Sequence, residues 1–378
     1  MTVTAEHSTQ DLRRRLTDHL VAEGVLRSPR WIRAFSTVPR ERFVPAFTLR
    51  TADGVRGVRE GDTAYLDTVY SDASLITQRD TSGTATSSSS QPRVMATMLE
   101  ALPDDDSTSV LEIGTGTGYN AALLCERYGS PNVTSVDIDP DLTTAARQRL
   151  HAAGYAPTLI TGDGTAAHAS DGPYNAVIAT CGLPRIPQGW LAQVVPGGTI
   201  VANLGYGLAV LHTDEHGTVQ GHFLPEMAAF MTARGSSSHT TGGHQGDLAA
   251  LMRATGSIIT VHLQCDVTAP MSRFLGGMLH PDTVDFTLTG EDGHVVHIVQ
   301  HPASGAWARM TMHGTEGARI DYDGPGGRNL WGERLPLMTA WAEAGRPGPE
   351  RYGLTVSGDG GHTLWLDGPG GRSWELPA

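Results

Sequence analysis

The stretch Val110-Leu-Glu-Ile-Gly-Thr-Gly-Thr-Gly-Tyr-Asn120 decides the fold of this chain of 378 residues. Its first four residues are apolar except for one glutamate, a pattern typical of a short buried strand. The three alternating glycines that follow have no Cβ, so the backbone there can turn sharply and come within contact distance of a ligand. A buried strand that runs through a glycine loop into a helix predicts a ligand site at the carboxyl end of that strand.

Strands and helices alternate after this stretch, which predicts an α/β fold built on a Rossmann-like, doubly wound sheet. Strands are expected at 110–113, 133–137, 157–161 and 175–180, with helices at 120–128 and 140–153. Three further segments, 199–204, 208–213 and 217–223, are expected to close the sheet as an antiparallel set.

The rest of the chain divides around this core. Residues 1–85 predict an N-terminal helical and loop region, with a first helix in which leucines recur every four residues. Residues 86–233 form the predicted core, and the Gly, Ser and Thr-rich stretch 234–246 is interpreted as a linker. Residues 247–378 alternate as strands around one helix at 329–344, and they predict a β-rich accessory domain of the α+β class.

The chemistry of the loop indicates a cationic cofactor. The spacing Gly-x-Gly-x-Gly differs from the Gly-x-Gly-x-x-Gly that seats a pyrophosphate at a helix N-terminus. Glu112, two residues before the first glycine, suits a cation rather than a phosphate. S-adenosylmethionine carries an ammonium and a sulfonium and no phosphate, so an acidic loop suits it.

Acidic residues follow two more predicted strands. Asp137 ends the second strand and is placed to hold both ribose hydroxyls of the cofactor, whereas Asp139 is interpreted as the cap of the next helix. Asp163, before Gly164, closes the third strand, where a carboxylate can accept the adenine amino group. Three acids at successive strand ends favour a nucleoside cofactor over ordinary surface turns.

Composition excludes several classes of partner. A net charge of −13 argues against nucleic acid, because affinity for phosphates comes from clustered Lys and Arg. The three cysteines form no Cys-x-x-Cys pair, so neither a zinc site nor a disulfide framework is expected. His212 and His216 flank a predicted hairpin turn and do not suggest a metal site either. Since no long apolar run occurs, we expect a cytoplasmic protein that contacts no membrane.

The serine run Ser87-Ser-Ser-Ser90, followed by Gln91-Pro92, stands just before the helix that precedes the glycine loop. Serine-rich stretches are commonly flexible linkers, and Ser90 could simply cap the helix. Its place next to the cofactor strand favours a polar site for the methyl acceptor instead.

Five segments carry a resemblance to a known family. Arg42-Phe-Val-Pro45, Ser88-Ser-Ser-Gln-Pro92, residues 111–119, Gly162-Asp-Gly164 and Phe223-Leu-Pro225 follow the order found in protein-L-isoaspartate O-methyltransferases. The chain resembles that family over residues 10–230. The resemblance implies a class I methyltransferase fold, S-adenosylmethionine as cofactor and S-adenosylhomocysteine as product. The expected cofactor contacts are Glu112, Gly114, Thr115, Gly116, Gly118, Tyr119, Asp137, Ile138, Asp163 and Gly164.

The same resemblance assigns the acceptor site. The family's serine that contacts the carboxylate being methylated matches Ser90, and Ser88 is expected to assist. A carboxylate is already ionised at neutral pH, so methyl transfer needs no general base and depends on alignment and on exclusion of water. Ser88 stands where the family has threonine and Ser89 where it has an apolar residue, a departure that bears on substrate choice.

The chain also resembles an actinobacterial branch of the family that acts on ribosomally made peptides in graspetide, lanthipeptide or lasso pathways. That resemblance implies a precursor peptide as partner, with an ordinary Asp esterified and the ester closing to an aspartimide or reaching isoaspartate. Two alternatives stay open: general isoaspartyl repair, and a non-catalytic peptide-binding protein with a methyltransferase fold.

Overall fold

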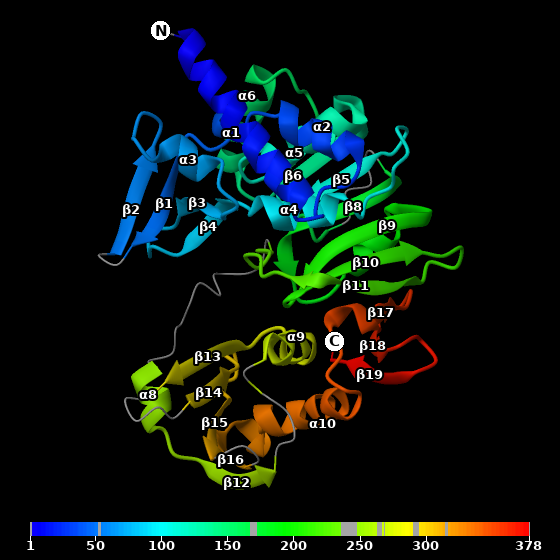
Figure 1. Cartoon of the computed structure of the whole chain (residues 1–378). Helices are drawn as coiled ribbons and strands as arrows, with labels where there is room; N and C mark the ends of the chain where they lie inside the picture. The colour runs from blue at the N-terminus through cyan, green and yellow to red at the C-terminus, as the bar shows by residue number, and fades with distance from the viewer. Residues whose placement is uncertain are drawn as a thin grey trace.

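The computed structural model describes residues 2–51, 54–166, 172–235, 248–262, 267, 269–289, 295–313 and 317–377. A ten-stranded sheet organises the chain, in the order β19-β18-β17-β11-β10-β9-β8-β5-β6-β7 (Figure 1). The five strands from β9 to β7 run parallel, and the others pair antiparallel. The α/β class I methyltransferase architecture is thereby confirmed. The first seven of these strands along the chain are β5 (Val110–Ile113), β6 (Val133–Asp137), β7 (Thr158–Thr161), β8 (Tyr174–Leu183), β9 (Val194–Leu204), β10 (Gly207–Thr213) and β11 (Val219–Met227).

Both faces of the parallel strands are buried. Consecutive residues of β5 alternate between two hydrophobic clusters, Val110 in one and Leu111 in the other. The cluster that holds Val110 also contains apolar residues of six helices: α1 (Thr2–Ala22), α2 (Pro29–Thr37), α3 (Tyr65–Val69), α4 (Pro92–Leu99), α5 (Tyr119–Tyr128) and α6 (Pro140–Ala152). The opposite face packs against Trp190 of α7 (Gln188–Leu191) and against the C-terminal region. Burial on both faces explains why apolar residues occur on both faces of these strands rather than on alternate positions only.

A second, four-stranded sheet stands beside the core. Its order is β2-β1-β3-β4, and α3 (Tyr65–Val69) lies next to it (Figure 1). The sequence predicted only loops with short strands over residues 46–85. The serine run is not the flexible linker that its composition alone would suggest, because Ser87, Ser88 and Ser89 belong to strand β4. The strands are β1 (Ala46–Thr51), β2 (Gly54–Arg59), β3 (Leu75–Arg79) and β4 (Ala85–Ser89).

The C-terminal residues are divided between two sheets. A five-stranded sheet, in the order β12-β16-β15-β14-β13, packs against α10 (Leu330–Glu343) and lies near α9 (Pro270–Leu279) and α8 (Leu248–Arg253) (Figure 1). Its strands are β12 (Ser257–His262), β13 (Val284–Thr289), β14 (Val295–Gln300), β15 (Trp307–His313) and β16 (Gly317–Asp323).

The last three strands return to the central sheet. They are β17 (Tyr352–Val356), β18 (His362–Leu366) and β19 (Arg372–Leu376), and β17 pairs with β11. Residues 247–378 were predicted to form one accessory unit, but the structure assigns residues 352–376 to the ten-stranded sheet. The predicted linker 234–246 lies outside the described residues, apart from its first two positions.

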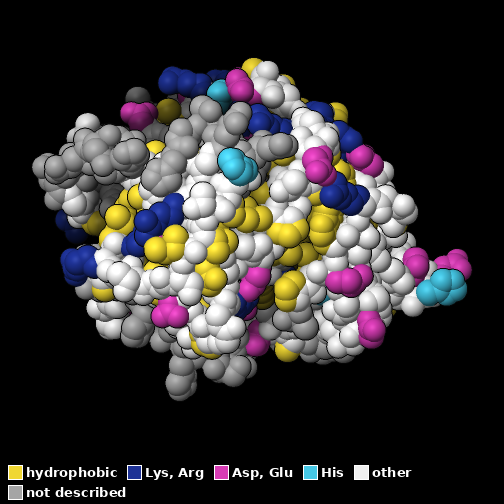
Figure 2. Space-filling model, turned by 90° about the horizontal axis from the view of Figure 1, so that it is seen from below, with side chains coloured by type: hydrophobic (Ala, Val, Ile, Leu, Met, Phe, Trp, Pro, Cys, Tyr) yellow, Lys and Arg dark blue, Asp and Glu magenta, His cyan; other side chains and the backbone are white. Residues whose placement is uncertain are grey.

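The molecular surface shows no concentrated basic face in the view of Figure 2. Arg side chains, the only Lys or Arg residues in this chain, occur there in separate places, among acids and around a central group of apolar side chains. Among the described helices, none is both long and apolar enough to cross a membrane.

A substitution at Gly353 tests how tightly β17 packs against β11 of the central sheet. A Cβ at Gly353 would stand 2.1 Å from the Trp365 ring and 2.5 Å from the Gly221 carbonyl oxygen, whereas a Cβ at Gly358 would meet nothing within 4 Å. We expect Gly353→Ala to lower the free energy of unfolding by about 2 kcal/mol, because it overpacks a buried strand pair. Gly358→Ala, the matched control, should change it by less than about 0.5 kcal/mol. Urea denaturation measures both, and equal effects would contradict the packing.

Candidate active site

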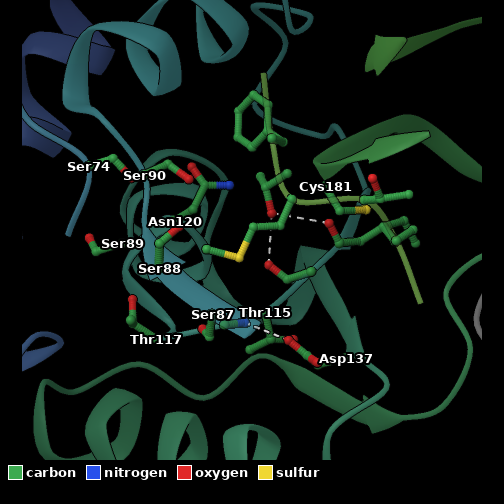
Figure 3. A pocket seen from close by; sticks show the side chains of 18 of the residues that line it. Ser74, Ser87, Ser88, Ser89, Ser90, Thr115, Thr117, Asn120, Asp137 and Cys181 are labelled. Atoms are coloured by element: carbon green, nitrogen blue, oxygen red, sulfur yellow. Dashed lines mark hydrogen bonds between the residues drawn. The ribbon is translucent and has the colours of Figure 1, made fainter. Parts of the chain in front are cut away.

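One cavity of about 520 Å³ opens at the carboxyl ends of β5, β6 and β8. Its volume lies in the range of roughly 300–1,000 Å³ that small-molecule sites occupy. Four groups of residues wall it: the end of β4, the glycine loop, the turns after β6 and β7, and the segment 226–234. Figure 3 shows the serines of β4 on one side of this cavity and Asp137 with Cys181 on the other.

The glycine loop takes a backbone shape that other residues rarely adopt. Gly114, Gly116 and Gly118 have φ of +96°, +52° and +87°. A Cβ at Gly114 would stand 2.8 Å from Oγ1 of Thr180. Gly114 and Gly116 line the cavity, as predicted for the cofactor site. Gly118 does not: it precedes α5, where a Cβ would approach Ala146 of α6 to 3.2 Å.

Asp137 is held in a single orientation at the end of β6. Its Oδ2 accepts a hydrogen bond of 2.7 Å from the Gly116 amide, and its Oδ1 accepts one of 3.1 Å from the Asp139 amide. The residue is 8% exposed, and burial raises the pKa of its carboxyl group. Asp139 caps α6 by accepting from the amides of Asp141 and Leu142, so its interpretation as a cap is confirmed.

Glu112 lies behind the loop and is not among the residues that line the cavity, so its contact with the cofactor stays a prediction. Its carboxylate is fully buried and accepts hydrogen bonds from Asn120 Nδ2 at 2.8 Å and Ser135 Oγ at 2.5 Å. Burial raises its pKa to about 7. Through these two hydrogen bonds, the Glu112 carboxylate holds the side chains of Asn120 and Ser135 in place.

Asn120 is a cavity residue that the sequence reasoning missed. It stands in the first turn of α5, 8% exposed, and its side-chain amide donates to Glu112. Its Oδ1 is buried and has no hydrogen-bond partner among the described residues. A buried acceptor left open beside a cavity indicates a place for a donor from a ligand. The position of Asn120, two residues after the last glycine of the loop, was the sequence feature that could have indicated it.

The remaining predicted cofactor residues all line the cavity: Thr115, Tyr119, Ile138, Asp163 and Gly164. Thr115 Oγ1 lies 2.6 Å from Ser135 Oγ, which ties the loop to the same group that holds Glu112. The Asp163 carboxylate accepts from the Thr165 hydroxyl at 2.6 Å, and the Gly164 carbonyl oxygen accepts from the Trp190 ring nitrogen at 2.8 Å.

Ser88, Ser89 and Ser90 all line the cavity, but the Ser89 hydroxyl is already bound by Arg40. Ser88 belongs to β4 and Ser90 directly follows its last residue, so both stand at the end of this strand. Ser89 is 3% exposed, and its Oγ accepts from Arg40 Nε at 3.2 Å. The Gly116 backbone lies against the same strand, since a Cβ there would stand 3.7 Å from the Ser88 carbonyl oxygen.

Arg40 supports this end of β4, and the sequence reasoning missed it. The side chain is fully buried, and its guanidinium donates to the carbonyl oxygens of Val69, Ser71, Ala73, Ser89 and Ser90 at 2.8–3.4 Å. Burial lowers its pKa to about 10, which still leaves it charged at neutral pH. Gln91 occupies the N-cap position of α4 without a capping side-chain hydrogen bond, and Asp72, next to this loop, accepts from the Arg93 amide at 2.8 Å instead.

The segment after β11 closes the far side of the cavity. Gly182 donates to the Met231 carbonyl at 2.8 Å, and the Ala233 amide donates to the Gly182 carbonyl at 2.8 Å. Phe230 and Met231 add apolar wall, and Arg234 adds a cation. Cys181 also lines the cavity, and burial raises its pKa to about 12, so the thiol is protonated. Within the described ranges, no three His, Cys, Asp or Glu side chains form a group suited to a metal ion.

Comparisons with known proteins agree with this geometry. The family profile described as protein-L-isoaspartate(D-aspartate) O-methyltransferase (PCMT) matches residues 11–217. The protein-L-isoaspartate O-methyltransferase of Hyperthermus butylicus is 34% identical over 206 residues, which cover 52% of this chain and 76% of the relative. That of Staphylothermus marinus is 33% identical over 223 residues, covering 56% of this chain and 89% of the relative.

A solved structure of a protein-L-isoaspartate O-methyltransferase shares the fold well beyond the matched family region. It is 24% identical, has a TM-score of 0.55, and covers 94% of this chain and 99% of its own. The fold and the cavity define a class I methyltransferase that uses S-adenosylmethionine. The chain belongs to the protein-L-isoaspartate O-methyltransferase family, whose members methylate protein carboxyl groups. The comparisons do not extend to the branch that acts on ribosomally made peptides.

Glu112 predicts a specific pH dependence of stability. The folded state holds its proton up to about pH 7, whereas the unfolded chain releases it near pH 4.5. Between these values the folded state binds more protons, so the free energy of unfolding falls as the pH rises through this window. We expect the wild type to lose up to about 3 kcal/mol more than Glu112→Gln between pH 5 and pH 8. Urea denaturation across this range measures the difference, and parallel pH curves would contradict it.

Proposed function

We propose that this protein transfers a methyl group from S-adenosylmethionine to the side-chain carboxylate of an aspartate-derived residue in a peptide or protein. The observation that carries the proposal is the meeting of two elements in one cavity. The glycine loop with Asp137 forms one part, and Ser88 with Ser90 forms the other. A cofactor site and a hydroxyl-lined acceptor site in contact are what a single-step transfer needs.

The residues present suit the cofactor. Asp137 is fixed by two backbone amides and faces the cavity, where its carboxylate would accept the two ribose hydroxyls. The open Oδ1 of Asn120 would accept from the cofactor's ammonium group, with Glu112 holding the amide in that orientation. Asp163 would accept from the adenine amino group. When bound, S-adenosylmethionine supplies a methyl group on a positively charged sulfur.

The chain's own groups would align the acceptor rather than activate it chemically. An Asp carboxylate has a reference pKa of about 3.9, so at neutral pH it is already the nucleophile and no residue has to take a proton. Ser90, assisted by Ser88, would donate to one carboxylate oxygen and leave the other toward the cofactor. Met95, Phe230 and Met231 narrow the cavity with apolar surface, which would exclude water from the carboxylate.

For the acceptor itself, we propose an ordinary Asp in a ribosomally made precursor peptide. Support comes from Ser88 and Ser89, which replace the threonine and the apolar residue of the family pattern. After esterification, the following backbone nitrogen would attack the ester carbonyl, methanol would leave with the amide proton, and a five-membered aspartimide would result. Hydrolysis of that ring would give aspartate or isoaspartate.

General isoaspartyl repair is the second candidate, and one observation favours it. A solved protein-L-isoaspartate O-methyltransferase shares the fold over 94% of this chain. The C-terminal region therefore does not by itself separate a dedicated peptide enzyme from other members of the family. Residue choice at the acceptor site, rather than chain length, is what distinguishes the two candidates.

Mass spectrometry of matched acceptors separates them. The full chain and S-adenosylmethionine are incubated with a peptide containing Asp from a neighbouring biosynthetic gene, and separately with a generic isoaspartyl peptide. We expect a gain of one methyl group on the first peptide, followed by loss of methanol. Reaction of the isoaspartyl peptide alone would establish repair, and reaction of neither would contradict both candidates.

Ser90→Ala tests the acceptor site. Loss of a hydrogen bond to a charged carboxylate should lower kcat/KM roughly tenfold to a hundredfold. The dissociation constant of S-adenosylhomocysteine, measured by calorimetry, should stay within about twofold of the wild-type value. Ser82→Ala is the control, because Ser82 is exposed and bonds only within its own turn. Unchanged kcat/KM in Ser90→Ala would remove this residue from the site.

Asp137→Asn tests the cofactor site. We expect the affinity for S-adenosylhomocysteine to fall roughly tenfold to a hundredfold, since a charged acceptor for two hydroxyls is lost. Asp141→Asn removes the same charge on the exposed first turn of α6 and should bind normally. Calorimetry measures both variants, and equal binding by the two would refute the assignment of Asp137.

A further inference from the structure

A second groove, of about 490 Å³, lies on the four-stranded sheet β2-β1-β3-β4. The bottom of the groove is formed by residues with small side chains or none, namely Ala46, Thr48 and Gly57. A Cβ at Gly57 would meet nothing within 4 Å, so the space above the strand is open. The other face of the same sheet is buried, with Phe47 at 3% and Val58 at 5% exposure in a hydrophobic cluster that includes Tyr65 of α3.

This groove continues the active-site cavity. The strand register places Ser88 opposite Ile76, Ile76 opposite Thr48, and Thr48 opposite Gly57. Residues directly opposite in antiparallel strands share one face of a sheet. Ile76 lines both the cavity and the groove. A continuous row of residues therefore leads from Ser88 on β4 across β3, β1 and β2. Figure 1 shows this sheet extending outward from the core beyond β4.

The groove is basic on a protein with a net charge of −13. It is lined by Arg59, Arg79 and one acid, Asp62. The Arg79 guanidinium is held in place by donating to Thr48 Oγ1 at 3.3 Å and to the Gly83 carbonyl at 2.8 Å. Asp62 accepts from the backbone amide of Arg59 at 3.0 Å. Over the described residues, neither arginine lies within ion-pair distance of a carboxylate, so both charges remain open to a partner.

We propose that this groove binds the acceptor peptide beside the methylated residue and selects an acidic side chain three or four residues away from it. The inference rests on the proposed function, because it takes Ser88 and Ser90 as the acceptor site. An extended segment that leaves the cavity at Ser88 would cross β3 and reach β1 and β2. Arg79 and Arg59 would then pair with its acidic side chain.

The spacing follows from sheet geometry. Strands lie about 4.8 Å apart, so Thr48 is roughly 10 Å and the row's end on β2 roughly 14 Å from Ser88. An extended peptide advances about 3.3 Å per residue. A peptide residue three positions from the one at Ser88 would therefore lie near Arg79, which is bonded to Thr48. A residue four positions away would lie at β2, the strand of Arg59.

The β2 strand offers a matched control. Arg59 pairs with Ala46 and Arg56 pairs with Leu49, three residues apart, so the two arginines stand on opposite faces of one exposed edge strand. Arg56 does not line the groove. Arg59→Glu and Arg56→Glu thus make the same charge change on the same strand, one inside the groove and one outside it.

Fluorescence anisotropy of labelled peptides, with the full chain loaded with S-adenosylhomocysteine at low salt, tests the proposal. Each peptide carries one acceptor, Asp or isoaspartate, with Glu-Glu or Lys-Lys at the third and fourth positions on either side. We expect the Glu peptide to bind the wild type about two- to fivefold more tightly than the Lys peptide on one of the two sides. Arg59→Glu should reverse that preference, and Arg56→Glu should keep it.

A second variant tests the groove without changing charge. Gly57→Phe places a ring in the open space and should weaken binding of both flanked peptides at least threefold, while methylation of an acceptor with short Gly flanks stays within twofold. An unchanged Glu-to-Lys ratio in Arg59→Glu, an equal effect of Arg56→Glu, or undetectable binding of every peptide would overturn the proposal. Methyl transfer to the Gly-flanked acceptor reports separately on the proposed function, so loss of that transfer in the wild type would identify failure of the function and not of the groove.

Discussion

The contact between the glycine loop and strand β4 is the constraint on which the active site depends. The two belong to different sheets, and a Cβ at Gly116 would already stand 3.6 Å from Ser87 Oγ. A Cβ at Gly116 would therefore fill the remaining space between the loop and β4, and any longer side chain there would meet the strand. The glycines therefore do two things: they adopt positive φ, and they let a second backbone lie against the loop. Gln78 adds a polar tie by donating to Asp139 at 3.0 Å.

Arg40 keeps the acceptor strand in that position from behind. A buried cation is costly unless its donors are satisfied, and here backbone carbonyls and one serine hydroxyl accept from it. Because carbonyl oxygens of both β4 and the 69–73 loop converge on one guanidinium, neither segment can move without leaving a buried charge short of partners. The polar acceptor site is thus rigid although it is built from serines, whose composition alone suggested a linker.

How far the sequence predicts this molecule depends on how local each signal is. The parallel strands and the loop were predicted closely because their pattern is contained within a few residues, and β5 and β6 begin and end where expected. Ser88 and Ser90, which the family resemblance singled out, both line the cavity, and their role toward the acceptor stays a prediction. The buried hydrogen bonds of Glu112 to Asn120 and Ser135 were not foreseen, because proximity along the chain does not reveal which way a strand residue points.

The partners that were missed lie far apart in sequence. Arg40 acts on Ser90, fifty positions away, and β17 pairs with β11 more than a hundred residues upstream. No periodicity within a window reports such contacts. Asn120 was present in the decisive stretch, but its importance comes from the open Oδ1, which is a property of the folded cavity. Long-range polar contacts, rather than element types, are what the sequence left undetermined.

Strand β11 links the C-terminal region to the active site. One edge of β11 pairs with β17, and its end leads directly into the segment that walls the cavity. That segment is anchored at Gly182, beside Cys181, and the Asn203 side chain also holds it by bonding the Ala228 carbonyl and the Phe230 amide. Since the same few residues close the cavity and connect to the C-terminal residues, the C-terminal strands are part of what shapes the acceptor site. Because β11 leads into the cavity wall, a shift of β17 against β11 would move that wall as well. The C-terminal strands therefore affect the shape of the cavity as well as completing the sheet.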